Sequence, residues 1–251
     1  MIELTSGDGH SFSAYRADPS EAPKGAVVVL QDFSGVGAHI QKEVDAFAAR
    51  GYVAIAPLLF QREHKQESVS EKEGVDIAKA VTVDSALLDV QAAIDSVKSA
   101  GKVAVVGYSW GGYLAYQSAN HLKDIACTIA YYAAGLTEGR TDKRRVPTLL
   151  HFPEDDPSTP LDGIVAFRAL RPDVSAFSYP KAKNGFNFET AETFDATAAE
   201  QAKERTLFWI SQFVEGQPPV TLKNSGAYAQ AKTEKKKKKA SGDDDMGPPM
   251  D

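Results

Sequence analysis

Short apolar blocks alternate with longer amphipathic stretches along most of this 251-residue chain. Blocks of four or five mainly apolar residues predict strands at 26–30, 53–56, 103–106, 128–132, 148–152 and 176–179. Apolar residues that recur every three or four positions predict helices at 40–50, 83–99, 113–121, 163–170 and 193–214. Because the strand blocks lack polar alternation, we expect both of their faces to be buried in a mostly parallel sheet with helices on both sides.

Two shorter blocks at the start of the chain follow a different pattern. Residues 2–4 and 11–15 flank the turn-forming sequence Gly7-Asp8-Gly9. They predict an antiparallel hairpin at the edge of the sheet. The predicted fold class is therefore α/β, with a mostly parallel central sheet and an N-terminal antiparallel edge hairpin.

The length suits one α/β domain, which we assign to residues 1–221. Beyond it, residues 222–251 lose apolar periodicity and include the lysine run from Lys235 to Lys239. Such a composition buries too little apolar surface to offset the entropy of ordering, so we predict a disordered, charged tail. The alternative for the lysine run is a nuclear-import or polyanion-binding patch.

Composition argues against several classes of protein. The net charge is −6, and residues 1–221 carry 21 basic against 29 acidic side chains, which is not typical of a nucleic-acid-binding protein. The chain shows neither a signal peptide nor an apolar run long enough for a membrane helix. Its single cysteine, Cys127, excludes an internal disulfide, so a cytoplasmic location fits best. A monomer and a homodimer both remain open.

One motif carries nucleophilic chemistry. The block at 103–106 runs directly into Gly107-Tyr108-Ser109-Trp110-Gly111-Gly112 and then into a predicted helix. This G-x-S-x-G pattern between strand and helix is typical of the nucleophile elbow of the α/β-hydrolase fold. The glycines let strand and helix approach closely, and the Trp110 N–H at the helix start is expected to be one oxyanion donor.

A second oxyanion donor is expected from the loop that follows the block at 26–30. We choose the Phe33 N–H in the sequence Gln31-Asp32-Phe33-Ser34-Gly35-Val36-Gly37. The end of this loop begins like a dinucleotide fingerprint, but Ile40 stands where the third glycine belongs, so no nucleotide cofactor is predicted. Spaced His, Cys and carboxylate ligands are absent from the sequence pattern, so no metal is predicted either.

In their order and spacing, several motifs resemble the dienelactone hydrolase family of α/β-hydrolases, and the resemblance spans roughly residues 1–215. They are Asp8-Gly9-His10, Gln31-Asp32 with Gly35-Val36, Arg50-Gly51-Tyr52-Val53-Ala54, the elbow around Ser109, His151-Phe152 with Asp156 and Pro160, and Glu204-Arg205-Thr206.

The resemblance implies a triad in which Ser109 is the nucleophile and Asp156 the acid, with the neighbouring Asp155 as its rival. Both acids could instead be ordinary turn residues. The chain departs from the family twice: lactone-cleaving members usually carry cysteine at the elbow, and Asn184 in Lys183-Asn184-Gly185-Phe186 stands where the family has its histidine.

Asn184 removes the proton carrier that a serine needs. An amide donates and accepts hydrogen bonds but does not titrate near neutral pH, so slow turnover is expected. Asp32, His39 and Tyr108 are predicted to line the substrate pocket. Asp32 could act as a weak base if burial raised its pKa, or could merely cap a turn, and His39 is the other candidate. His151 is interpreted as a core histidine.

Two functions therefore compete. The first is a serine hydrolase that cleaves small-molecule esters or lactones through Ser109. The second is a catalytically impaired protein that binds a carboxylate or ester ligand in the same pocket, as the asparagine at 184 would suggest. The sequence alone also allows Asn184 to be a deliberate substitution that traps substrate.

Overall fold

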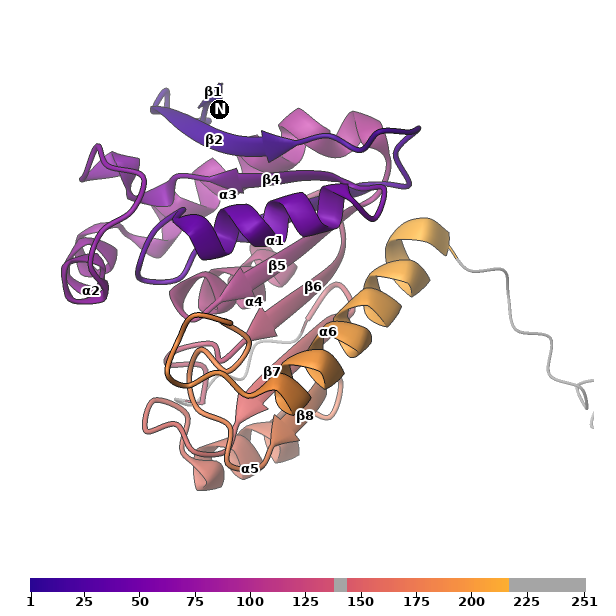
Figure 1. Cartoon of the computed structure of the whole chain (residues 1–251). Coiled ribbons are helices and arrows are strands. Elements are labelled where there is room, and N and C mark those ends of the chain that lie inside the picture. Colours follow the sequence, from indigo (N-terminus) through magenta and orange to yellow (C-terminus); the bar gives the residue numbers. More distant parts are fainter. Residues whose placement is uncertain (138–143, 217–251) are drawn as a thin grey trace, which may run out of the picture. The chain divides into compact units, whose positions relative to one another are not determined.

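Eight strands form one sheet in the order β1-β2-β4-β3-β5-β6-β7-β8 (Figure 1). The computed structural model describes residues 1–137 and 144–216, so the tail predicted at 222–251 lies outside the described residues. Strands β1 and β2 are antiparallel to their neighbours, whereas the pairs from β4 to β8 are parallel. The strands are β1 Ile2–Thr5, β2 Ser11–Ala17, β3 Ala26–Leu30, β4 Val53–Pro57, β5 Val103–Tyr108, β6 Ile125–Tyr131, β7 Thr148–Pro153 and β8 Ser175–Tyr179.

Helices cover both faces of the sheet. In Figure 1, α1 and α6 lie in front of the strands, and α3 and α4 lie behind them. The helices are α1 Ala38–Ala48, α2 Glu71–Ala80, α3 Val83–Val97, α4 Trp110–His121, α5 Leu161–Leu170 and α6 Ala196–Ile210, with the short turns η1 Leu59–Arg62, η2 Lys98–Ala100 and η3 Ser211–Gly216.

The burial pattern explains why the central strands are continuous apolar blocks. Along β3, Val27 and Val29 join the core under α1 and α6, whereas Ala26, Val28 and Leu30 join the core under α3 and α4. Successive side chains of a strand point to opposite faces, so a strand that is covered on both sides needs apolar residues throughout.

The predicted α/β fold is confirmed, as are the predicted strands and the antiparallel edge hairpin. Boundaries shift by a few residues: α4 begins at Trp110 rather than at 113, and β6 ends at Tyr131 because Tyr132 adopts a positive φ of 37°. One helix was missed. The segment 71–80, which carries no predicted element, forms α2.

Candidate active site

Ser109 lies at the sharp turn between β5 and α4. Its φ of 51° and ψ of −114° are values that side-chain-bearing residues rarely adopt. Its N–H donates to the Tyr131 carbonyl (3.0 Å), and its carbonyl accepts from the Tyr113 N–H (3.1 Å). The strained conformation is therefore held by backbone hydrogen bonds to β6 and to the first turn of α4.

The two glycines of the motif are required by contact distances. A Cβ at Gly107 would lie 2.0 Å from the Gly111 carbonyl oxygen, and a Cβ at Gly111 would lie 2.3 Å from the Gln31 carbonyl oxygen. Both contacts involve backbone atoms, which cannot move aside cheaply. The Gly111 N–H also donates to the Gln31 carbonyl at 3.0 Å. This bond fixes the elbow against the end of β3.

The same contact brings together the two predicted oxyanion donors. Phe33 follows Gln31 by two residues, and Trp110 precedes Gly111 directly. The Trp110 N–H is at the first position of α4, where a helix leaves its amides without an intrahelical acceptor. An oxyanion there would also lie near the positive end of the helix dipole. The assignment of both donors stays a prediction.

Helix α2 and the segment before it support this loop. This support was not predicted from the sequence. The Val36 N–H donates to the Glu67 carbonyl (2.7 Å), and the Val69 N–H donates to the Ser34 carbonyl (3.0 Å). Gly74 of α2 lies so close to Phe33 that an added Cβ would be 1.6 Å from the Phe33 carbonyl oxygen. Gly74 thus sets how close α2 can approach the predicted oxyanion loop.

A local signal could have identified α2. Ser70 precedes the helix and Glu73 follows three positions later, which is the capping-box pattern. In the structure the Ser70 side chain accepts from the Glu73 N–H at 3.3 Å. Gly74 is the only fully buried residue of α2, and Ile77 and Ala78 are partly buried against the core, so the apolar face of this helix is short.

The structure brings Asp156 and Asn184 together. Asn184 Nδ2 donates to Asp156 Oδ2 at 3.0 Å, while Asp156 Oδ1 accepts from both the N–H and the hydroxyl of Ser158 at 2.8 Å. Asp156 is buried, with 6% of its surface exposed. The rival Asp155 is exposed, and its carboxylate lies 3.9 Å from Lys183 Nζ. Burial and the contact with Asn184 thus distinguish Asp156 from its neighbour.

The Asn184 side chain can make one of the two hydrogen bonds that a histidine makes in a triad. A carboxylate only accepts, so the Asn184 amide must turn its NH₂ toward Asp156. Nδ2 of asparagine stands at the same distance along the side chain as Nδ1 of histidine, which is the nitrogen that the acid of a triad holds. The shorter amide has no atom that corresponds to Nε2. Asn184 can therefore be oriented by Asp156 but cannot carry a proton away from a serine.

Asp32 lies in the loop beside the elbow, and its carboxylate accepts from the Ser34 N–H at 2.7 Å. It therefore does cap a turn, which was one of the two alternatives. Burial raises the pKa of Asp32 above its usual value, and the nearby Glu71 carboxylate adds to this effect, although the Ser34 hydrogen bond opposes it. A raised pKa is what a carboxylate needs to act as a base near neutral pH.

His39 is buried on α1, with 7% of its surface exposed. Its ring stacks on Phe188 (centroids 4.3 Å apart) and meets the edge of Tyr108 (5.3 Å). Burial lowers the pKa of His39 to about 4, so the imidazole is neutral at physiological pH. Nε2 is buried and has no hydrogen-bond partner among the described residues. Tyr108 itself donates to the Glu43 carboxylate at 3.1 Å.

His151 is a core histidine, as predicted. It is completely buried, and its two ring nitrogens bond to the Tyr179 hydroxyl (2.8 Å) and the Thr206 hydroxyl (3.0 Å). Burial lowers the pKa of His151 to about 3. Both nitrogens are occupied, so His151 is not available to Ser109.

In the part of the chain that the structure describes, no side chain forms a hydrogen bond with Ser109 Oγ. Asp32 and Asn184 form hydrogen bonds with other residues. His39 Nε2 has no hydrogen-bond partner among the described residues. Apo geometry does not by itself exclude a base, because catalytic hydrogen bonds often tighten only with substrate. The site combines a strained serine, the Trp110 amide at the start of α4 and a buried carboxylate at Asp156, an arrangement that can support acyl transfer.

Two further findings concern the described residues. Within residues 1–137 and 144–216, His, Cys, Asp and Glu side chains do not gather in groups of three that could hold a metal ion. No helix in the described ranges combines the length and the apolar character that crossing a bilayer would require.

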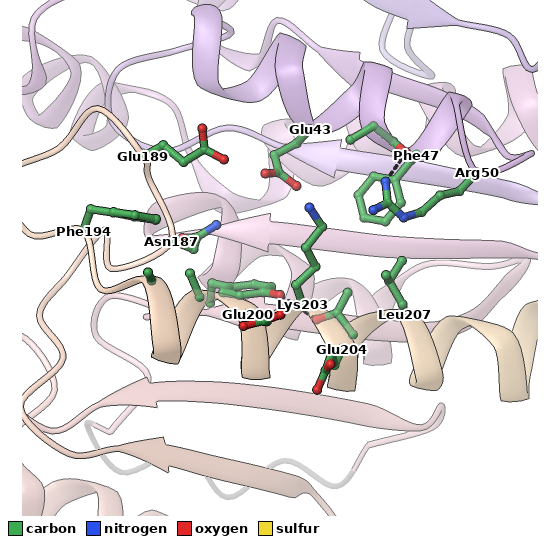
Figure 2. A pocket seen from close by; sticks show the side chains of 15 residues that line it. Glu43, Phe47, Arg50, Asn187, Glu189, Phe194, Glu200, Lys203, Glu204 and Leu207 are labelled. Atoms are coloured by element: carbon green, nitrogen blue, oxygen red, sulfur yellow. Dashed lines mark hydrogen bonds between the residues drawn. The ribbon is translucent and has the colours of Figure 1, made fainter.

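A separate groove lies between α1 and α6 (Figure 2). Its volume is about 470 Å³, and Ser109, Asp156 and Asn184 are not among the described residues that line it. The groove is therefore distinct from the site at the elbow.

Comparisons with known proteins show which family the chain is similar to. The sequence profile of the dienelactone hydrolase family matches residues 12–214. A carboxymethylenebutenolidase from Pseudomonas putida is 28% identical over 233 residues, which cover 86% of this chain and 98% of that protein. A putative carboxymethylenebutenolidase from Azospirillum brasilense is 29% identical over 231 residues, covering 84% and 97%. A solved structure of a putative dienelactone hydrolase from Klebsiella pneumoniae subsp. pneumoniae MGH 78578 is similar with a TM-score of 0.75 at 24% identity, covering 84% of this chain and 99% of its own.

Proposed function

The chain belongs to the dienelactone hydrolase family, and from that premise we propose that it hydrolyses small carboxylic esters or lactones by acyl transfer through Ser109. The observation that carries the proposal is the strained Ser109 backbone at the junction of β5 and α4, held against the end of β3. A backbone strain of this kind persists only when the surrounding structure enforces it, and it places the hydroxyl at the carboxyl edge of the sheet.

The reaction would proceed in two steps. Ser109 Oγ attacks the acyl carbonyl, a new C–O bond forms, and the alkoxide leaving group departs with a proton. Water then attacks the acyl-enzyme, releases the carboxylic acid and returns the proton to Ser109. The Trp110 and Phe33 amides would stabilise the negative oxygen in both steps.

Asn184 makes this cycle slow. Asp156 holds the Asn184 amide at 3.0 Å, but the amide cannot accept the Ser109 proton. In subtilisin, which is the standard reference for such a loss, removal of the base costs about 10⁶-fold in kcat, and a residual enhancement of about 10³-fold to 10⁴-fold over water remains. We expect a loss of similar size here. Asp32, with its raised pKa, or the neutral His39 would then have to serve as a weaker base.

Hydrolysis of p-nitrophenyl acetate by the parent chain and by Asn184→His tests the proposal. The histidine Nδ1–H would replace the amide N–H on Asp156 and would supply the missing Nε2, so hydrolysis should rise by several orders of magnitude. The matched control is the double variant Asn184→His with Ser109→Ala, which should show no rise. If Asn184→His hydrolyses the ester no faster than the parent chain, then Ser109, Asp156 and residue 184 do not form a triad.

The second candidate is a protein that binds a carboxylate or ester ligand at the same pocket without turnover. The contact between Asn184 and Asp156 favours it, because this contact keeps the pocket ordered and removes the proton carrier. Binding of a substrate analogue together with an inactive Asn184→His variant would support this candidate over the first.

A further inference from the structure

The groove between α1 and α6 has the size and lining of a small-molecule site. Pockets for small ligands commonly range from about 300 to 1,000 Å³, and this one measures about 470 Å³. Phe47 of α1 and Leu207 of α6 supply apolar walls, and the base is formed by Tyr131 and Thr206. Tyr131 ends β6 and is only 3% exposed, so its hydroxyl lies at the buried bottom of the groove.

A chain of buried hydrogen bonds leads to the Tyr131 hydroxyl. The chain begins at Arg205, whose Nη1 donates to the Tyr179 hydroxyl at 2.8 Å. A guanidinium can only donate, so the Tyr179 hydroxyl accepts from Arg205. Tyr179 is buried, and His151 Nδ1 at 2.8 Å is the only acceptor for its O–H among the described residues, so we assign Tyr179 as the donor of this bond. The neutral His151 therefore carries its proton on Nε2.

The position of the His151 proton determines which groups donate between His151 and the groove. His151 Nε2–H donates to the Thr206 hydroxyl at 3.0 Å. Thr206 has only one other partner among the described residues, the Tyr131 hydroxyl at 2.7 Å, and either hydroxyl can be the donor of that bond. One O–H of this pair, both of which line the groove, therefore has no acceptor in the described part of the chain, and we assign it to Tyr131. A buried donor without an acceptor is costly unless the groove contains one.

Other groups around the groove are also donors. Asn187 accepts from the Tyr132 hydroxyl at 2.7 Å through Oδ1, which leaves its NH₂ free. Lys203 extends from α6 across the groove toward Glu43 and Arg50 of α1 (Figure 2), and no ion-pair partner of Lys203 occurs within the described ranges.

Acidic residues are present as well, but they do not occupy these donors. Glu43 accepts from the Tyr108 hydroxyl, and burial raises the pKa of Glu43, which favours its neutral form. Glu189 is exposed and pairs with Lys42. Glu200 and Glu204 are exposed, as Lys203 is, so solvent screens these charges to a similar degree, and neither glutamate forms an ion pair with Lys203 within the described ranges.

We propose that this groove binds a small carboxylate with an apolar body. The Tyr131 O–H and the Lys203 ammonium hold the carboxylate, with the Asn187 amide as a further donor, and Phe47 and Leu207 contact the body. This site is separate from Ser109, and its occupation does not depend on hydrolysis there.

Calorimetric titration of the full chain with benzoate tests the proposal. Benzoate should bind, and benzamide, which has the same shape without the charge, should bind more weakly. Tyr131→Phe and Lys203→Met should each weaken benzoate binding about tenfold, because each removes a donor to a charged oxygen. Tyr15→Phe is the matched control: Tyr15 also donates to a carboxylate, at Asp45, but does not line the groove, so affinity should not change.

Two structural measurements complete the test. The anomalous signal of bromine in a crystal soaked with 4-bromobenzoate should lie between α1 and α6. Heteronuclear NMR of the His151 ring should show the proton on Nε2, as the donor chain requires. Three outcomes would overturn the proposal: bromine at Ser109 instead, a His151 proton on Nδ1, or no benzoate binding at millimolar concentration, which would leave only water on Tyr131.

Discussion

The two sides of the active site are held in different ways. On the elbow side, backbone bonds fix Ser109: Ser109 N–H to the Tyr131 carbonyl, and Gly111 N–H to the Gln31 carbonyl, each at 3.0 Å. On the other side, a single side-chain bond of 3.0 Å joins Asn184 to Asp156. The position of Ser109 therefore depends on backbone hydrogen bonds, whereas the contact at Asp156 depends on the side chain at position 184. The backbone geometry at the elbow therefore does not depend on which residue occupies position 184.

The most severe way to break the elbow side is Gly111→Ala. The new Cβ would lie 2.3 Å from the Gln31 carbonyl oxygen, so α4 would have to move away from β3. We expect a loss of more than about 3 kcal/mol in the free energy of unfolding, which is the range of severe packing and backbone conflicts. Chemical denaturation followed by circular dichroism measures it. Ala115→Gly, at a buried position of the same helix but without such a conflict, is the comparison variant and should cost about 2 kcal/mol, from lower helix propensity and one lost buried methyl. Equal losses would contradict the packing argument.

A reactive fluorophosphonate sharpens the comparison, because it reports on the elbow without needing full turnover. Ser109 should be labelled slowly in the parent chain and not at all in Ser109→Ala, since the oxyanion donors act on developing charge whatever the base. If Asp32 is the residual base, Asp32→Asn should slow labelling by about 10²-fold, and His39→Gln should not.

The pH dependence separates the same two bases. With Asp32 as the base, the labelling rate should rise with pH through a carboxylate pKa that burial has raised. With His39 as the base, the rise should be centred near pH 4, because burial lowers the pKa of His39 to about 4. No labelling over hours in a folded chain would contradict residual catalysis and would favour the ligand-binding candidate.

Much of this molecule could be predicted from local sequence. Strand β3 is apolar throughout because both faces are buried, and the elbow is defined by consecutive residues from Gly107 to Gly111. What could not be predicted depends on contacts between distant segments. The burial that distinguishes Asp156 from Asp155 belongs to this class, as does the hydrogen-bond chain from Arg205 to Tyr131. Helix α2 was missed because only a short apolar face of it packs against the core.

Gly74→Ala probes the support of the predicted oxyanion loop with a smaller expected effect. The added methyl conflicts with the Phe33 carbonyl, so α2 must move or the loop must shift. We expect a loss of about 1–3 kcal/mol in unfolding free energy, typical of overpacking. Fluorophosphonate labelling of Ser109 should slow as well, since Phe33 N–H would be displaced. The control is Asp76→Gly, at an exposed position two residues from Gly74 and so on the opposite side of the helix, which should lower stability without slowing the labelling. Normal labelling in Gly74→Ala would contradict the coupling between α2 and the predicted oxyanion loop.

The smallest expected effect concerns His39, a buried titratable group beside the elbow. Burial lowers the pKa of His39 from 6.5 to about 4. Between these two pH values the imidazole is therefore neutral in the folded protein and charged in the unfolded protein. Stability from this group is therefore complete above pH 6.5 and is lost as the pH falls toward 4, by about 1.4 kcal/mol per pH unit.

The variant His39→Phe tests this effect. It keeps the ring between Phe188 and Tyr108 but cannot be protonated, and Nε2 has no described partner to lose. At pH 8 the two chains differ only by packing. Between pH 8 and pH 5 the variant should gain about 2 kcal/mol relative to the parent, as measured by denaturation at each pH. A constant difference across this range would show that His39 takes up its proton at the same pH in the folded and unfolded states, so that burial does not keep it neutral at low pH.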